Sequence, residues 1–281
     1  MTDFHINDPD LVVPRLDRFD LVVINSSGGK DSQAMTDYVV FTADSQGYPR
    51  DKLVMAHADL GRVEWPGTKE LVQEHADHYG LRLVIEKRPQ GDLLDHVEQR
   101  GMWPSSTARY CTSDHKRGQI QRAYTYLTRE IRDANPGHPK PRIINCFGFR
   151  SEESPARAKR KPWSINKVAT TKTTRDVFDW LPIHCWLEPA VWKRIKQAGT
   201  RHHWAYDRGM TRLSCRFCIF APRSQLMVSA CQPENKELFE EYVALEDKMG
   251  HTFRKKQSLR EIKEAIEAGE TPSEDDTQWN M

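Results

Sequence analysis

Short apolar runs alternate with amphipathic segments along most of the chain. Residues 20–25, DLVVIN, form a continuous apolar run that predicts a strand buried on both faces. Further strands are predicted at 53–57, 81–86 and 142–148, and a weaker one at 180–183, where Pro182 restricts the strand to an edge or an end of the sheet. Helical spacing of apolar residues predicts a helix through Ala34 to Phe41 and further helices at 68–79, 92–100, 116–134, 188–198, 233–249 and 258–268.

This order of elements predicts an α/β fold with a doubly wound parallel sheet, because strands and helices alternate through the first part of the chain. The later segments are helical and contain most of the cysteines. We therefore expect a sheet domain at 1–184, including a basic loop at about 150–176, and a Cys-rich helical region at 185–281.

Charge is distributed unevenly over the 281 residues, although 42 basic side chains nearly balance 40 acidic ones. The near balance excludes a uniformly basic nucleic-acid binder, and 38% hydrophobic residues exclude a disordered chain. Residues 100–175 carry 17 Lys and Arg against 5 Asp and Glu, whereas residues 234–281 carry 7 against 13. The basic block is either a solvated surface or a segment that holds an anionic substrate.

The chain shows no sign of membrane insertion or export. No apolar run approaches the roughly 20 residues of a membrane span, and the first ten residues are acidic where a signal peptide is basic and then apolar. We expect a cytoplasmic protein without a membrane partner. Its six cysteines are then reduced, and they are available as ligands or nucleophiles.

A turn rich in serine and glycine joins the first predicted strand to the first helix. Glycines let the backbone approach a phosphate, and the backbone N–H groups and the helix dipole favour an anion there. The turn is not the GxxxxGK[ST] loop, which needs a glycine at Ile24 and a hydroxyl at Asp31. The alternative is a turn that is merely capped by a side chain. We interpret the turn as a phosphate-binding loop made of Ser26, Ser27, Gly28, Gly29, Lys30, Asp31 and Ser32.

Four of the cysteines have the spacing of a metal site. Cys215 and Cys218 form a CxxC, Cys231 follows thirteen residues later, and Cys111 lies upstream in RYCTSDHKR. Four thiolates suit tetrahedral zinc or an iron-sulfur cluster, and the spacing does not separate the two. The other two cysteines, Cys146 and Cys185, are predicted to be core thiols.

The motifs resemble those of a known superfamily. Residues 27–32, SGGKDS, match the SGGxDS signature of the PP-loop ATP pyrophosphatases. Further stretches are similar to its phosphoadenosine-phosphosulfate reductase branch: HADLGRVEWPGT at 57–68, RYCT at 109–112 with Lys116, and GFR at 148–150 followed by EES and Arg157. One upstream Cys, a CxxC and a later Cys further resemble the iron-sulfur ATP pyrophosphatase of DNA phosphorothioation systems. The resemblance covers about 20–231.

The resemblance implies an adenine nucleotide alpha hydrolase-like fold that binds ATP, with Mg²⁺, at the loop. It assigns catalysis to Lys30, Asp31 and Arg150, and it places Gly148 and Arg150 at the phosphates and His57 and Asp59 near the adenosine. Members of the superfamily cut ATP between its α and β phosphates and adenylate an oxygen. The activity expected here is adenylation of a nucleic-acid or nucleotide oxygen in support of sulfur insertion, as in DNA phosphorothioation or tRNA thiolation.

The same resemblance implies a polyanionic substrate, a metal cofactor and partners. The substrate-binding residues would be Arg109, Lys116, Arg157, Lys159, Arg160 and Lys161. A [4Fe-4S] cluster, with Zn²⁺ as the alternative, would be held by Cys111, Cys215, Cys218 and Cys231. The expected partners are a cysteine desulfurase as sulfur donor, a nucleic acid and a second copy of the chain.

Two other functions stay open. A phosphoadenosine or adenosine phosphosulfate reductase of this branch uses a separate catalytic cysteine near its C-terminus, and no cysteine follows Cys231 in these residues. A nucleic-acid-binding module without catalysis would use the four cysteines for structural zinc, and it would not turn over nucleotides.

Overall fold

The computed structural model describes residues 12–255, 257–273 and 279. The chain forms two compact units, each discontinuous in sequence. The first unit extends to His57 and includes Glu70–Glu86 and Ile120–His202, and the second comprises Ala58–Lys69, Lys87–Gln119 and the chain from His203 on. This division differs from the expected boundary at residue 184, because the chain passes repeatedly between the units.

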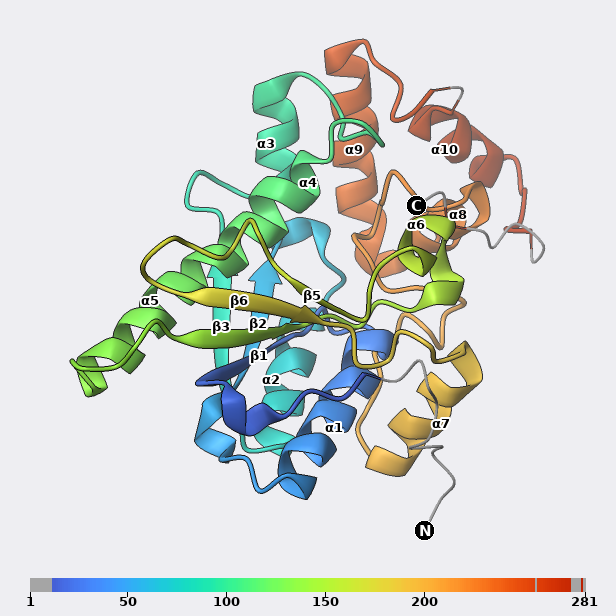
Figure 1. Cartoon of the computed structure of the whole chain (residues 1–281). Helices are drawn as coiled ribbons and strands as arrows, with labels where there is room; N and C mark the ends of the chain where they lie inside the picture. Colours follow the sequence, from blue (N-terminus) through green and yellow to red (C-terminus); the bar gives the residue numbers. More distant parts are fainter. Residues whose placement is uncertain (1–11, 256, 274–278, 280–281) are drawn as a thin grey trace. The chain divides into compact units, whose positions relative to one another are not determined.

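A six-stranded sheet forms the centre of the first unit, with the strand order β3-β2-β1-β4-β6-β5 (Figure 1). β1 pairs in parallel with β2 and β4, and β4 pairs in parallel with β6, whereas β5 is an antiparallel edge strand. The strands are β1 (Leu21–Asn25), β2 (Leu53–Asp59), β3 (Arg82–Lys87), β4 (Arg142–Cys146), β5 (Trp163–Ile165) and β6 (Asp176–Trp180).

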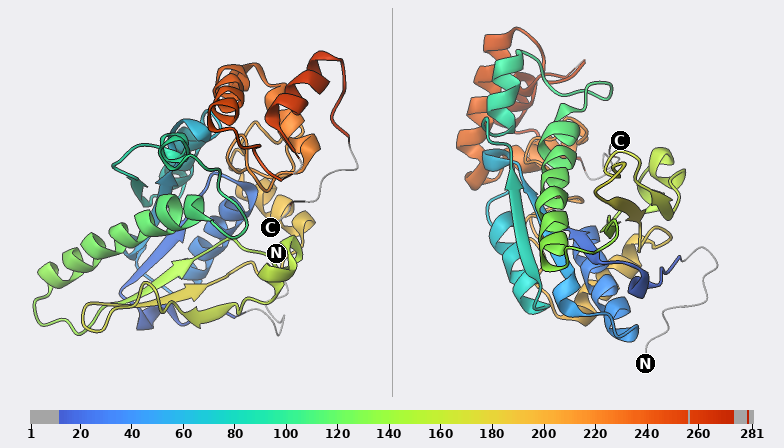
Figure 2. Two further views of the ribbon diagram at one scale, coloured as in Figure 1. Left: turned by 90° about the horizontal axis from the view of Figure 1, so that it is seen from above. Right: turned by 60° about the vertical axis from the view of Figure 1, so that its left-hand side comes forward.

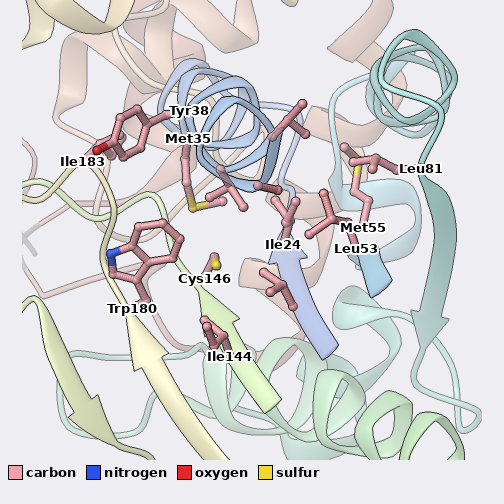
Figure 3. Packing of buried hydrophobic residues seen from close by; sticks show 14 of the residues in the cluster. Ile24, Met35, Tyr38, Leu53, Met55, Leu81, Ile144, Cys146, Trp180 and Ile183 are labelled. Atoms are coloured by element: carbon pink, nitrogen blue, oxygen red, sulfur yellow. The ribbon is translucent and has the colours of Figure 1, made fainter. Parts of the chain in front are cut away.

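Helices cover both faces of this sheet, as a doubly wound fold requires. α5 runs alongside the strands on one face (Figure 2), and α1 lies on the other face (Figure 3). The helices of this unit are α1 (Lys30–Ser45), α2 (Thr68–His78), α5 (Gly118–Ala134), α6 (Pro155–Ala158) and α7 (Glu188–Ala198), the last of which packs on α1. The predicted α/β fold class is confirmed.

The core of the first unit lies between α1 and the sheet. Ile24, Cys146 and Trp180 project from the strands towards Met35 and Tyr38 of α1 (Figure 3), and all five side chains are buried. A central parallel strand has to be apolar on both faces, and β1 is buried from Leu21 to Ile24. Burial raises the pKa of the Cys146 thiol well above its ordinary value, so this cysteine is a core residue as predicted.

Two predictions in the C-terminal part of the sheet are wrong. The strand expected at 180–183 is β6 (Asp176–Trp180), which lies inside the sheet between β4 and β5. Pro182 follows the end of that strand, so it restricts nothing within it. The stretch 150–176 is not one long loop, because it contains a 3-10 turn at Ser151–Glu153, the helix α6 and the edge strand β5.

The regular secondary structure of the second unit is helical in the part of the chain that the structure describes, apart from the last two residues of β2, the last residue of β3 and one bridge between Arg254 and Gln257. A π-helical turn, Ser113–Arg117, connects α4 to α5. Capping boxes with Asp92 and Ser258 begin α3 and α10. The helices are α3 (Leu93–Arg100), α4 (Tyr110–Thr112), α8 (Arg223–Ala230), α9 (Lys236–Met249) and α10 (Leu259–Glu267), of which α4 and α8 lie outside every predicted helix.

Among the described residues, no helix is both long and apolar enough to cross a membrane.

Candidate phosphate-binding site

The serine- and glycine-rich turn connects the carboxyl end of β1 to the start of α1. Gly28 has φ 72°, in the left-handed region that favours glycine, and Gly29 is the extended N-cap residue of α1. No side chain caps this helix end. Backbone N–H groups at the start of a helix attract an anion, and the helix dipole adds to the attraction.

Serine hydroxyls brace the turn from inside. The Ser32 hydroxyl donates to the Gly29 carbonyl at 2.9 Å and accepts from the Ser27 N–H at 3.2 Å. The Gly28 N–H donates to the Ser26 hydroxyl at 3.4 Å. These bonds hold the turn in one conformation before any ligand arrives, which lowers the entropy that binding has to offset.

Gly148, which follows β4, lies directly against the start of α1. An added Cβ at this position would be 2.9 Å from the carbonyl carbon and oxygen of Asp31 and 3.0 Å from the Ser32 nitrogen. All three are backbone atoms, which cannot rotate away. Glycine is required here by close approach rather than by φ, and the predicted role of Gly148 in nucleotide binding stays a prediction.

Two cations are buried beside the turn. The side chains of Lys30 and Arg150 are each only 3% exposed. Arg150 Nε donates to Asp31 Oδ1 at 2.6 Å, and its guanidinium also pairs with Glu152. Glu188, at the start of α7, faces both cations, with its carboxylate oxygens 3.4 Å from Lys30 Nζ and 3.7 Å from Arg150 Nη2. Buried charges require such partners.

His57 supports the turn from β2. Its Nδ1 lies 2.9 Å from the Ser26 carbonyl oxygen, and the ring is buried. Because a carbonyl accepts, Nδ1 carries the proton in this hydrogen bond. The side chain therefore positions the loop backbone, and its predicted place near the adenosine stays a prediction.

Basic and aromatic residues follow Arg150. The Arg157 guanidinium pairs with Glu153 and lies 4.3 Å from the centre of the Phe149 ring. The exposed Arg160 guanidinium lies 5.3 Å from the same ring, and Phe149 stacks on Phe147. Lys159 and Lys161 are exposed. The predicted substrate-binding residues of this unit thus lie in the segment that follows Arg150.

Three other predicted site residues belong to the second unit. Asp59 accepts the Gly61 N–H at 2.7 Å, so its carboxylate forms a turn there. The Arg109 guanidinium lies 4.5 Å from the centre of the Phe220 ring. The charge of Lys116 lowers the pKa of the Cys111 and Cys215 thiols, which are described next.

Three of the four candidate metal ligands, Cys111, Cys215 and Cys218, lie in or against one hydrophobic cluster of the second unit. Burial raises the pKa of the Cys215 thiol, Lys116 opposes this effect, and Cys218 and Cys111 add to it. The pKa of Cys111 is likewise raised by burial, with Lys116 opposing. Cys231 is exposed at the end of α8, and burial alone raises its pKa.

The described residues do not form a finished metal site. Among residues 12–255, 257–273 and 279, no three His, Cys, Asp or Glu side chains are placed to hold one ion. The arrangement gathers three thiols and leaves out Cys231, so it does not fit the expected four-cysteine cluster.

Sequence reasoning missed the carboxylate that faces both buried cations. Glu188 lies about 160 residues after the loop at the start of a predicted helix, where an acidic residue is ordinary. The stacked pair Phe147 and Phe149 was also missed. Its one available signal was the alternation of aromatic residues around Gly148.

The fold and this turn define an α/β protein with a phosphate-type loop at the carboxyl end of its first strand. The chain belongs to the phosphoadenosine phosphosulfate reductase domain family, whose model matches residues 21–221. A curated relative, an uncharacterized 37.8 kDa protein of Escherichia phage 186, is 27% identical over 154 residues, which are 55% of this chain and 42% of that protein. The match thus spans less than half of the relative.

Solved structures of low identity are also similar. The phosphoadenylyl-sulfate reductase of Candida auris, in a phosphate complex, is 16% identical with a TM-score of 0.48, over 71% of this chain and 83% of that chain. The FMN adenylyltransferase of Candida glabrata, in complex with FAD and pyrophosphate, is 14% identical with a TM-score of 0.43, over 71% and 58%. Because identity and structural similarity are this low, the function of this chain has to be argued from its own residues.

Proposed function

We propose that this chain is an ATP pyrophosphatase that adenylates an oxygen of a nucleic acid or nucleotide and so supports sulfur insertion. The nucleotide binds with its phosphates on the turn from Ser26 to Ser32. A phosphate or base oxygen of the acceptor attacks the α phosphorus, the bond from that phosphorus to the bridging oxygen breaks, and pyrophosphate leaves. The terminal sulfur of a donor persulfide then attacks the activated atom and AMP leaves with its oxygen. A second thiol cleaves the remaining S–S bond, so a disulfide forms and the sulfur stays on the acceptor.

The pair of buried cations beside the loop carries this proposal. Lys30 and Arg150 share Glu188, whose side chain is 46% exposed and therefore able to withdraw into water. A triphosphate can replace that carboxylate as their counter-ion. Both cations then face the charge that develops on the leaving pyrophosphate, and preorganised charges of this kind supply much of the catalysis in phosphoryl chemistry.

The other loop residues hold the bound nucleotide before the reaction. The Gly29 N–H and the Ser27 hydroxyl donate to phosphate oxygens. The Gly28 N–H and the Ser32 hydroxyl keep the loop in shape through their bonds to Ser26 and to the Gly29 carbonyl, and Asp31 orients Arg150 through its 2.6 Å hydrogen bond. Mg²⁺ is expected with the nucleotide, because ATP phosphates bring it. An anionic phosphate acceptor needs no general base.

The sulfur-transfer half of the proposal rests on the resemblance and on the cysteine pattern. It calls for a cysteine desulfurase as the sulfur donor, a nucleic-acid substrate, a dimer and a cytoplasmic location. A bound [4Fe-4S] cluster would supply a site for sulfur, and zinc would supply structure alone. Because the described thiols do not form a four-cysteine site, no step of the reaction given above passes through a cluster.

One experiment separates this function from its alternatives. The purified protein is incubated with α-labelled ATP or with phosphoadenosine phosphosulfate plus reduced thioredoxin, and the products are identified. AMP and pyrophosphate from ATP are expected, with turnover rising when an acceptor nucleic acid is added. Sulfite from the sulfated nucleotide would assign a reductase instead. Turnover of neither substrate, with stoichiometric zinc, would assign a binding module.

A further inference from the structure

A cavity of about 530 Å³ lies in the first unit, formed by the second half of α5, the turn after it and the residues just before β6. Basic and hydroxyl side chains dominate its lining. Those used below are Thr125, Thr128, Arg129, Arg132, Asp133 and Arg175. The volume is in the range of small-molecule sites in proteins.

The cavity and the serine- and glycine-rich loop lie at opposite ends of the parallel strands. β1, β4 and β6 are parallel, and the loop follows the carboxyl end of β1. Arg175 directly precedes the amino end of β6, and the five residues of β1 separate the two edges by roughly 17 Å. α5 runs alongside the strands and so reaches the cavity with its second half (Figure 2). The cavity therefore lies away from the loop.

Arg175 is a buried charge without a carboxylate partner. It is 8% exposed, and burial lowers its pKa. Its Nε donates to the Ala169 carbonyl at 3.0 Å, its Nη1 donates to the Thr125 hydroxyl at 3.3 Å, and the guanidinium lies 5.9 Å from the centre of the Tyr124 ring. Among the described residues, no acid lies within ion-pair distance of it. Buried guanidinium groups normally have an anionic partner.

Thr128 gives a second, independent observation. Its side chain is 3% exposed and lines the cavity, and its hydroxyl has no hydrogen-bond partner among the described residues. An unsatisfied buried hydroxyl costs free energy, so it calls for a ligand atom. A buried cation and a buried hydroxyl thus both lack the same kind of partner, an oxygen that carries negative charge.

We propose that this cavity is a phosphate-binding site. Arg129, Arg132 and Arg175 against Asp133 give its lining a net charge of +2, which matches the charge of about −2 on a phosphate monoester. Guanidinium groups bind phosphate through parallel N–H···O bonds, and the threonine hydroxyls add donors for further oxygens. Arg175 and Thr128 form the floor of the site. The exposed Arg129 and Arg132 close over the ligand from the rim.

The test uses calorimetric titration of the full chain with inorganic phosphate. We expect Thr128→Val to weaken binding by about tenfold, because one buried hydrogen bond to a charged group is lost. The Arg129→Ala/Arg132→Ala double variant should weaken it further. Thr128→Val should leave the melting temperature in phosphate-free buffer unchanged, because none of the described residues bonds to the lost hydroxyl.

Two control variants separate this site from the loop. Arg122→Ala, also exposed on α5 but outside the cavity, should bind phosphate as the wild type does. Ser32→Ala should abolish any phosphate binding at the loop and keep the binding that depends on Thr128. Phosphate binding that is lost in Ser32→Ala and unchanged in both cavity variants would overturn the proposal, and it would leave the proposed ATP site intact.

A second titration identifies the source of the phosphate group. Oligothymidylate that binds with the same dependence on Thr128, Arg129 and Arg132 would assign the site to a nucleic-acid backbone. If inorganic phosphate binds at the cavity but oligonucleotide binding does not depend on Thr128, Arg129 and Arg132, the site is assigned to a free phosphate compound. Failure of both probes to bind the wild type would also overturn the proposal.

Discussion

Single residues at the loop act through close approach and paired charge. Gly148 permits the contact of two backbones, and Arg150 and Lys30 are buried because carboxylates face them. The loop itself was predictable from sequence, because its glycines and hydroxyls are local. The role of Glu188 was not predictable, because a residue so distant along the chain gives no local signal of contact with Lys30.

Gly148→Ala tests the close approach. The new Cβ would meet the backbone of Asp31 and Ser32, and we expect weaker ATP binding and a loss of about 1–3 kcal/mol in the free energy of unfolding. Urea unfolding and equilibrium binding measure the two effects. Gly137→Ala is the control, because its Cβ would meet only Asn135 Oδ1 at 4.0 Å. Equal behaviour of the two variants would refute the packing argument.

His115 makes the stability of the second unit depend on pH. Its ring lies 3.0 Å from His96, and burial lowers the pKa of His115 from 6.5 to about 4, with His96 and Arg88 adding and Asp114 opposing. In the unfolded chain His115 binds a proton below about pH 6.5, whereas in the folded chain it binds one only below about pH 4. The stability is therefore full above pH 6.5 and falls as pH falls through this window.

The expected loss is on the order of 3 kcal/mol between these limits. Urea unfolding at a series of pH values measures it, and His115→Gln should flatten the curve. A His115→Gln curve as steep as that of the wild type would assign the pH dependence to other groups.

At the scale of elements, local patterns predicted β1 to β4 well, and non-local pairing decided the rest. The central strands are continuous apolar runs, whereas β6 reads DVFDW and contains two aspartates. Asp179 accepts from Asn145 on β4 at 2.7 Å and from Asn166 at 2.9 Å. Partners of this kind lie on other strands, so the sequence of β6 alone does not reveal why a charged residue belongs there.

Asn145→Leu tests this polar network across the sheet. Asn145 also accepts from Asn25 at 2.6 Å, so the substitution leaves two half-buried partners short of a hydrogen bond. We expect a loss of about 1–3 kcal/mol in urea unfolding with an unchanged slope. Asn135→Ala, at an exposed position, should change little. An unchanged free energy of unfolding in Asn145→Leu would show that the network adds no stability.

The whole molecule consists of two units, and the chain enters each of them more than once. Charge counts along the sequence could not show this division, because the basic block at 100–175 is itself shared between the units. The phosphate loop belongs to the first unit and the cysteines Cys111, Cys215 and Cys218 to the second. Discontinuous units of this kind arise from contacts between segments far apart in sequence, for which local patterns carry no signal.

Metal content tests the second unit in the intact protein. The structure gathers Cys111, Cys215 and Cys218 and leaves Cys231 exposed. The described side chains are not placed to hold an ion, so metal binding requires these thiols to move together. In protein purified anaerobically with iron or zinc bound, we expect Cys215→Ser to lose the metal and Cys231→Ser to keep it, as measured by elemental analysis and the absorption spectrum. Equal losses in both variants would instead support a four-cysteine site.

The central claim is that the turn from Ser26 to Ser32 is the site of ATP cleavage. The direct measurement is the rate of pyrophosphate release from ATP by the wild type, by Gly28→Ala/Ser32→Ala and by the control Ser45→Ala, which alters an exposed serine at the far end of the same helix. Urea unfolding confirms that each variant is folded. We expect release by the wild type and the control, and its loss in the loop variant. An unchanged rate in a folded loop variant would contradict the account.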